Sequence, residues 1–269
     1  MVDYDTSKNL INESCSLEEG KLFVVSTPIG NLEDITLRAL NVLKEVDVIA
    51  AEDTRHTSKL LRHFSIQTKL ISYHEHNEES KSELILKLIK NGKNVALVSD
   101  AGTPMISDPG YVIVRSAIKE NIEVIPVPGV TACIAALVSS GLSSDFFTFV
   151  GFLPRQKSKR TERLKELSVY RSTLVFYEAP HRLLEMMESL VEVIGDRKCA
   201  LVKEITKKFE STKRGFLSDV INEVKQTEVK GEYVIIVDGA EIEDVVKEKN
   251  KRHKNKYYEY SKVDVCKSD

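Results

Sequence analysis

The sequence predicts an α/β fold built on a mostly parallel sheet that helices cover. Short apolar runs of strand length alternate with segments of helical hydrophobic spacing, and the links between them are short. Three of the apolar runs end in loops rich in glycine, proline and aspartate, and open α/β sheets place their ligands at such loops. The chain has 269 residues and is 42% hydrophobic, which is enough for two compact units or one large one.

The first half of the chain has the strictest alternation. Residues 1–20 are polar and acidic without periodicity, which predicts a flexible leader. The first apolar run is cut by Thr27-Pro-Ile-Gly30, as expected for a buried strand that enters a turn. The segment after it carries apolar residues at helical spacing. The expected strands are residues 22–26, 46–51, 94–98 and 122–127, and the expected helices are residues 34–45, 55–64, 78–89, 111–119 and 131–140.

The composition changes near residues 141–144, where the alternation becomes less strict. We therefore expect an N-terminal α/β domain of residues 21–143 and a C-terminal α/β domain of residues 144–240. Residues 241–269 form a charged tail with a composition typical of disorder. In the second domain the expected strands are residues 146–152, 173–177, 199–203 and 233–237, and the expected helices are residues 181–193 and 216–224.

The composition excludes several classes of protein. No apolar run approaches the roughly 20 residues that a membrane span needs, and no apolar stretch follows a basic start as in a secretory signal. The four cysteines form no CxxC pair, which favours free thiols in a reducing cytoplasm. We therefore expect a cytoplasmic protein that does not bind membranes.

Several catalytic motifs are missing from the sequence. It has no GxxxxGK[ST] phosphate loop, no GxGxxG fingerprint, no HExxH and no Gly-x-Ser-x-Gly elbow. His74 and His76 would share one face of a strand, but on an exposed loop they are simply polar, and we predict no metal site.

Three loops remain as candidates for a ligand site. They are Thr27-Pro-Ile-Gly-Asn31, Ser99-Asp-Ala-Gly-Thr-Pro104 and Pro126-Val-Pro-Gly-Val-Thr131. Glycine lets a backbone approach a ligand closely, and proline fixes the shape of a loop. Each loop alone is compatible with a tight turn. Three such loops on one sheet edge predict a ligand cleft, in which the Asp100 carboxylate can accept hydrogen bonds from a sugar or an amine.

The residues in and around these loops carry a longer resemblance. The segments are Thr27-Pro-Ile-Gly-Asn-Leu-Glu-Asp-Ile-Thr36, Ala51-Glu-Asp-Thr-Arg-His-Thr57, Ser99-Asp-Ala-Gly-Thr-Pro-Met-Ile-Ser-Asp-Pro-Gly110 and Val127-Pro-Gly-Val-Thr-Ala132. They resemble the tetrapyrrole methylase superfamily, and within it the ribosomal RNA small-subunit methyltransferase I subfamily of cytidine 2′-O-methyltransferases. The resemblance extends to residue 240 through Phe149-Val-Gly-Phe-Leu-Pro154, Tyr177-Glu-Ala-Pro-His-Arg182, Lys203-Glu-Ile-Thr-Lys207 and Gly231-Glu-Tyr-Val234.

The resemblance implies a fold, a cofactor and a reaction. The fold is the two-domain class III methyltransferase type, with S-adenosylmethionine in a cleft between the domains. The reaction is methyl transfer to the 2′-hydroxyl of a cytidine in the decoding region of small-subunit ribosomal RNA, as naked RNA or in the 30S subunit. Members are commonly homodimers, and they often carry a further helical C-terminal region that is replaced here by the short basic tail. The implied cofactor-binding residues are Pro28, Asp100, Ala101, Gly102, Met105, Ile106, Thr131, Ala132, Leu153, Tyr177 and Ala179.

The reaction itself limits which residues are needed. The sulfonium is already activated, so the main contribution of the enzyme is positioning. A ribose hydroxyl is a weak nucleophile, and a general base, or a lysine that lowers its pKa, would help. The candidates are Asp53, His56, Glu204 and Lys207. For Asp53 the alternative is a helix N-cap, and for Lys207 it is a phosphate contact or plain solvation, so the sequence does not choose among them.

Basic residues in the second domain give an independent indication of an RNA substrate, because clustered cations neutralise phosphates. Their alternative is a solvated helix face. The basic tail and its tyrosines offer further contacts to RNA. The expected RNA-binding residues are Arg55, Arg155, Lys157, Lys159, Arg160, Arg182, Lys207 and Lys208.

Two other functions are compatible with the sequence. One is a small-molecule methylase of the same superfamily, which predicts a broad apolar cleft and no salt-sensitive RNA binding. The other is a non-catalytic RNA-binding factor, which predicts RNA binding without methyl turnover.

Overall fold

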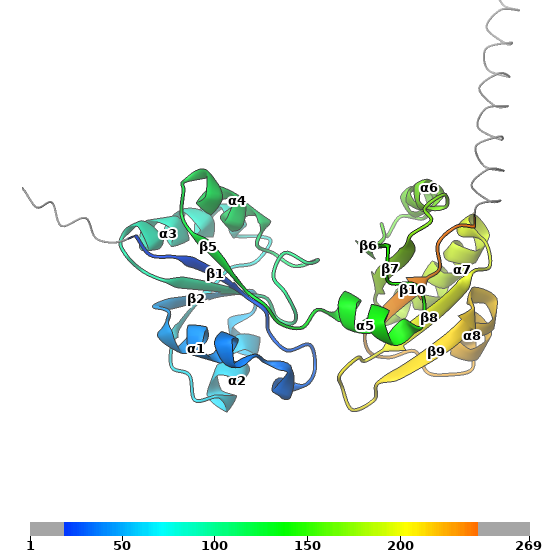
Figure 1. Cartoon of the computed structure of the whole chain (residues 1–269), viewed down its shortest axis with the longest axis horizontal. Coiled ribbons are helices and arrows are strands. Elements are labelled where there is room, and N and C mark those ends of the chain that lie inside the picture. Colours follow the sequence, from blue (N-terminus) through cyan, green and yellow to red (C-terminus); the bar gives the residue numbers. More distant parts are fainter. Residues whose placement is uncertain (1–18, 242–269) are drawn as a thin grey trace, which may run out of the picture.

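The computed structural model describes residues 19–241. The expected leader and charged tail therefore lie almost entirely outside the described residues. Two five-stranded sheets form the centres of two packed units, joined through the segment before α5 (Ala132–Ser140) (Figure 1). Within residues 19–241, no helix is long and apolar enough to span a membrane.

The first sheet is parallel throughout, as the alternation in the sequence predicts. Its order is β3-β2-β4-β1-β5, and every neighbouring pair runs in the same direction. The strands are β1 (Leu22–Val25), β2 (Val48–Ala51), β3 (Lys69–Ser72), β4 (Val95–Val98) and β5 (Val124–Val127). All residues of β2 and β4 are buried, which explains their continuous apolar runs.

Helices cover both faces of this sheet (Figure 1). On one face α1 (Leu37–Glu45) and α2 (Thr54–His63) share a core with β1 and β2, and on the other α3 (Glu78–Lys90) and α4 (Tyr111–Lys119) do so. The neighbouring strands β1 and β4 lead into helices on opposite faces, α1 and α4. A crevice therefore opens at their carboxyl ends, where open α/β sheets bind ligands.

The three loops that the sequence singled out meet at this edge. Thr27 and Gly102 exchange two backbone hydrogen bonds, at 2.8 and 2.9 Å between nitrogen and oxygen. The Thr103 hydroxyl lies 2.8 Å from the hydroxyls of both Ser26 and Thr131. Because these contacts join the ends of β1, β4 and β5, the predicted cluster of loops is confirmed and is rigidly tied.

The second sheet is mixed, with order β6-β7-β10-β8-β9. Only β6 and β7 are parallel, and the other neighbours are antiparallel. The strands are β6 (Phe147–Phe152), β7 (Thr173–Glu178), β8 (Lys198–Lys203), β9 (Ser211–Phe216) and β10 (Tyr233–Val237).

Helices also cover the second sheet. On one face lie α6 (Lys157–Leu167), α7 (Leu183–Ile194) and α8 (Leu217–Lys225), which share one apolar core with the strands. On the opposite face α5 packs Cys133, Ala136 and Leu137 against Val175, Ala200 and Ile236. The boundary expected at residues 143/144 assigns α5 to the first domain, whereas its apolar contacts place it on the second sheet.

Candidate active site

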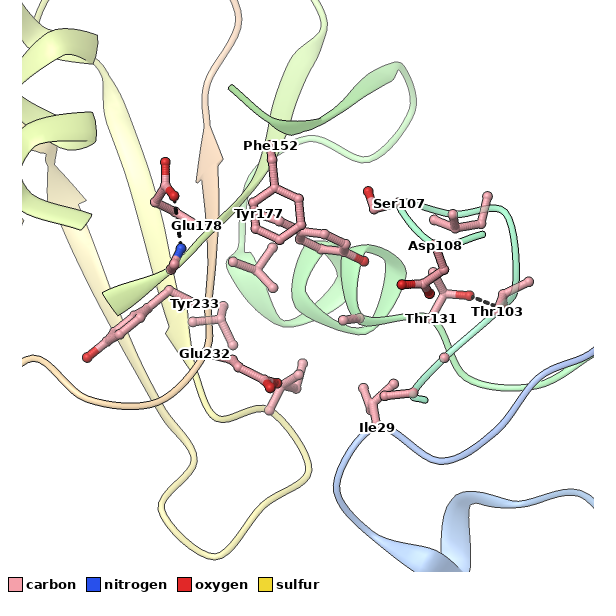
Figure 2. Close-up of a pocket in the computed structure, with 18 of the residues that line it drawn as sticks. Ile29, Thr103, Ser107, Asp108, Thr131, Phe152, Tyr177, Glu178, Glu232 and Tyr233 are labelled. Atoms are coloured by element: carbon pink, nitrogen blue, oxygen red, sulfur yellow. Dashed lines mark hydrogen bonds between the residues drawn. The ribbon is translucent and has the colours of Figure 1, made fainter. Parts of the chain in front are cut away.

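A cleft of about 290 Å³ lies where the loops of the first sheet face the second sheet. The loops after β1 and β4 line it from the first unit. The start of α5 and the cleft-side ends of β6, β7, β8 and β10 line it from the second unit (Figure 2). Its lining residues are Ile29, Ala101, Gly102, Thr103, Ile106, Ser107, Asp108, Thr131, Ala132, Phe152, Tyr177, Glu178, Ala179, Pro180, Val202, Ile205, Glu232, Tyr233 and Val234.

Most of the expected cofactor residues line this cleft. Seven of them do so directly: Ala101, Gly102, Ile106, Thr131, Ala132, Tyr177 and Ala179. Pro28 and Asp100 line a smaller adjoining pocket of about 210 Å³, on the other side of the Thr27–Gly102 bridge, together with His56. Met105 and Leu153 line neither space. Leu153 is buried in the core of the second unit, and Met105 is partly exposed in a left-handed turn with φ 73°.

Aromatic side chains form one wall of the cleft. The Tyr177 ring meets Phe149 and Phe152 edge-on, at centroid distances of 5.1 and 5.7 Å. The Tyr177 hydroxyl oxygen accepts the Cys133 amide at 2.9 Å, which ties the wall to the start of α5. Burial raises the pKa of Tyr177, so its hydroxyl remains protonated.

Asp108 is a cleft carboxylate that the sequence reasoning missed. Figure 2 shows it on the loop after β4, facing Tyr177 across the cleft. Burial, followed by the negative charge of Glu52, raises the pKa of Asp108 to about 7. Like Asp100, it follows β4 within the segment that carries the resemblance, and a search for every carboxylate in that segment would have found it.

Two of the candidate bases, Asp53 and His56, lie at the start of α2. Asp53 is the N-cap of that helix, because its Oδ1 accepts the Arg55 amide at 2.8 Å. Hydrogen bonds from the Arg55 side chain and amide hold the pKa of Asp53 well below its usual range. Asp53 is therefore a poor proton acceptor, and the structure favours the capping alternative. His56 lies outside the main cleft, in the adjoining pocket.

Glu204 and Lys207 form an ionic network at the mouth of the cleft. Lys207 Nζ donates to Glu204 Oε1 at 3.1 Å and to Glu232 Oε2 at 2.9 Å. Burial acts against both charges, but the hydrogen bonds outweigh it, raising the pKa of Lys207 and lowering that of Glu204. Both groups stay charged, so Lys207 is a fixed cation at this site.

The same lysine joins the two units. A Cβ added at Gly30 would lie 2.3 Å from Lys207 Cγ and 3.0 Å from the Thr206 hydroxyl. The segment after β8 therefore rests on the loop after β1, and only glycine leaves room for it. This contact closes one side of the cleft.

Comparisons with known proteins place this architecture in a family. A family model described as Tetrapyrrole (Corrin/Porphyrin) Methylases matches residues 21–221. This chain belongs to the tetrapyrrole methylase family. A ribosomal RNA small subunit methyltransferase I from Halalkalibacterium halodurans is 50% identical over 222 residues, 82% of this chain and 77% of that protein. The Bacillus subtilis protein of the same name is 48% identical over 229 residues, 85% of this chain and 78% of that protein.

Solved structures of methylases share the fold. A cobalt precorrin-4 methyltransferase superposes with a TM-score of 0.61 at 18% identity, covering 86% of this chain and 98% of that one. A uroporphyrin-III C-methyltransferase from Thermus thermophilus, complexed with S-adenosylhomocysteine, has a TM-score of 0.58 at 22% identity, covering 81% and 97%. The two-domain class III methyltransferase fold expected from the sequence is confirmed.

The basic residues of this methylase divide into a buried and an exposed set. Arg160 is only 1% exposed, and its guanidinium contacts Glu185, Ser189 and the Arg155 carbonyl. The expectation that Arg160 contacts RNA is therefore wrong. On α6 it shares one face with Leu164 and Leu167, which are also buried, and this spacing could have revealed its position.

Arg182 also has an internal role. It lies in a short 3-10 turn, Pro180–Arg182, where it donates to the Leu153 carbonyl at 2.9 Å and pairs with buried Glu178. By contrast, the basic residues at the start of α6 are exposed and follow directly on Phe152 in the cleft wall. The exposed members of the expected set are Arg55, Arg155, Lys157, Lys159 and Lys208.

Within residues 19–241, no group of three or more His, Cys, Asp or Glu side chains is arranged to hold a metal ion. His74 Nε2 instead lies 3.0 Å from the side-chain nitrogen Nδ2 of Asn77.

Proposed function

We propose that this methylase transfers the methyl group of S-adenosylmethionine to the 2′-hydroxyl of a cytidine in the decoding region of small-subunit ribosomal RNA. The observation that carries the proposal is the cleft between the two units, in a chain with relatives at 50% and 48% identity that are named ribosomal RNA small subunit methyltransferase I. The proposed partner is the RNA itself or the assembled 30S subunit in the cytoplasm, and we expect the enzyme to act as a homodimer.

The residues of the cleft fit the cofactor. Ala101 and Gly102 line one side of the cleft. Gly102 has φ +82° and carries no side chain, so a ligand can approach the main chain closely there. The aromatic wall and the Asp108 carboxylate suit a positively charged ligand. When bound, S-adenosylmethionine supplies an electrophilic methyl group on a cationic sulfur. The protein must then orient the ribose hydroxyl towards it and exclude water.

Asp108 is the side chain best placed to accept the proton of the ribose hydroxyl. It lies in the cleft, and its pKa of about 7 matches what a general base needs near neutral pH. Lys207 stays cationic at the mouth, where Glu204 and Glu232 accept two of its three ammonium hydrogens. The third hydrogen is suited to contact a phosphate, or the ribose hydroxyl, whose pKa it would lower. This division of roles assigns proton transfer to the first unit and substrate orientation to the second.

The exposed basic residues favour RNA over a tetrapyrrole as the substrate. Arg155 lies three residues after the cleft-lining Phe152, which ends β6. Lys157 and Lys159 lie in the first turn of α6, which begins at Lys157. Cations at that position can neutralise the phosphates of a strand that enters the cleft. These three cations do not line the cleft. A strand that extends beyond the cleft can reach them, whereas a small molecule held within the cleft cannot.

Purified protein with labelled S-adenosylmethionine should transfer label to small ribosomal subunits or to their RNA. A matched pair of variants tests the site. Gly102→Ala and Gly141→Ala place a methyl group at similar left-handed angles, φ +82° and φ +79°, but only Gly102 lines the cleft, while Gly141 faces open space. Gly102→Ala should raise the KM for the cofactor roughly 5- to 150-fold, a typical effect of overpacking, and Gly141→Ala should leave it unchanged.

Absence of transfer to subunits and to RNA, with cofactor binding intact, would refute the proposed function. Transfer to a tetrapyrrole precursor alone would identify the chain as a small-molecule methylase.

A further inference from the structure

The segment between β8 and β9, residues 204–210, forms a rigid loop beside the cleft, which we call the β8–β9 loop. Glu204 and Thr206 hold left-handed backbone angles, φ 50° and φ 65°. The Thr206 amide donates to Glu210 Oε2 at 2.6 Å, and the Lys207 amide donates to the Glu204 carbonyl at 2.9 Å. With Lys207 resting on Gly30, the loop is anchored at both ends and across the cleft.

This loop presents Phe209 to solvent. The Phe209 side chain is 70% exposed, and the exposed Lys208 places its ammonium 5.6 Å from the ring centroid. Four residues earlier, Ile205 lines the cleft. The Cα atoms of Ile205 and Phe209 are therefore at most roughly 14 Å apart. The ring and its neighbouring cation thus lie on a fixed support close to the cleft mouth.

We propose that Phe209 is a stacking platform for an unpaired base of the RNA strand that leads into the cleft. The proposal rests on the proposed RNA substrate. Single-stranded RNA is typically held by aromatic rings that stack on bases, beside cations that track the phosphates. Phe209 supplies the ring, Lys208 supplies the adjacent charge, and the anchored loop removes most of the ordering cost of binding. The platform recognises a strand by stacking, so it accepts any base.

Substitution separates stacking from phosphate contact. Phe209→Ala should weaken binding of a single-stranded oligonucleotide from small-subunit ribosomal RNA roughly 5- to 150-fold. It should leave the slope of log K against log salt unchanged, because a ring neutralises no phosphate. Lys208→Gln should reduce the steepness of that slope by about 0.7. Phe209→Tyr should retain the affinity of the wild type.

A tryptophan reporter tests the contact directly. The sequence contains no tryptophan, so Phe209→Trp creates a single fluorophore on the platform. Its emission should be quenched when the oligonucleotide is added. Phe146→Trp is the matched control, because Phe146 is also 70% exposed but lies before β6, at the opposite end of that strand from the cleft-lining Phe152. Its emission should not change.

The outcomes distinguish this proposal from the proposed function. Methyl transfer by the wild type, with unchanged emission of Phe209→Trp and wild-type affinity of Phe209→Ala, overturns the stacking platform and leaves the function standing. Quenching and weakened binding in a protein that transfers no methyl group to small subunits or to their RNA support the platform and overturn the function. No binding to the oligonucleotide, to small-subunit RNA or to the assembled subunit overturns both.

Discussion

Asp108→Asn is expected to lower kcat for methyl transfer by about 10²- to 10⁴-fold, the usual contribution of a general base. Asparagine keeps the shape of the side chain but cannot accept the proton of the ribose hydroxyl. Binding of S-adenosylmethionine should be affected much less than turnover, since the backbone of the loop and the aromatic wall remain. Single-turnover methyl transfer, together with cofactor binding measured by calorimetry, separates the two effects.

The pH profile makes this prediction sharper. A base works when it is deprotonated, so kcat/KM of the wild type should rise with pH and level off above about pH 7, the pKa of Asp108. Glu52 contributes to that raised pKa, so Glu52→Gln should move the rise to lower pH while preserving the plateau. A profile of Glu52→Gln that coincides with the wild type, or an Asp108→Asn variant with full turnover, contradicts the assignment.

The contribution of Asp108 to folding stability should fall as the pH rises, whereas kcat/KM of the wild type should increase. In the folded state Asp108 binds its proton more tightly than in the unfolded chain, so its contribution to stability falls as pH rises from about 4 to about 7. Asp108→Asn removes that ionisation. The melting temperature of the variant relative to the wild type should therefore rise from about pH 4 to about pH 7 and stay constant at higher pH.

Arg160→Ala is expected to destabilise the protein by about 3 kcal/mol, the lower end of the range for breaking a buried ion pair. The lower end applies because the Glu185 side chain is largely exposed and keeps access to water. Ser189 and the Arg155 carbonyl lose a donor, and the buried face of α6 loses its largest side chain. Denaturant unfolding followed by circular dichroism measures the loss.

The exposed residues on the same segment provide the control. Reversing the charge of Arg155 and Lys159 should change stability by no more than about 0.5 kcal/mol, but should weaken RNA binding and flatten its dependence on salt. Arg160→Ala, assayed where it is folded, should leave that salt dependence unchanged. Wild-type stability of Arg160→Ala would contradict the structural role that we assign to Arg160. A change in the salt dependence of RNA binding like that of the exposed residues would contradict it as well.

Much of the fold was predictable because its signals are local. The buried strands of the first sheet are continuous apolar runs, and α4 was expected at residues 111–119, where it is found. By contrast, β3 and β9 escaped detection. β3 has no buried residue, and β9 carries Thr212, Lys213 and Arg214 on the edge of the second sheet, so neither has the apolar run of an inner strand.

The sequence predicted the loops of the site, but it predicted less well the position of α5 and the roles of Asp108 and Arg160. Glycine and proline after β1, β4 and β5 marked the cleft, because close backbone approach requires them. The position of α5 depended on long-range packing, since its small apolar residues suit either sheet. The importance of Asp108 depends on burial beside Glu52, which no spacing in the sequence reveals. Arg160 was assigned to RNA binding because it lies in a run of basic residues. The composition of such a run does not show which face of the helix is buried.

The most direct test of the central claim is a map of ribose methylation on small-subunit ribosomal RNA from cells with and without this protein. We predict one 2′-O-methylcytidine in the decoding region that is present with the wild type, absent without the protein, and not restored by the Asp108→Asn variant. Identical ribose methylation in both RNAs, or a difference confined to methylation of a base, would contradict the account.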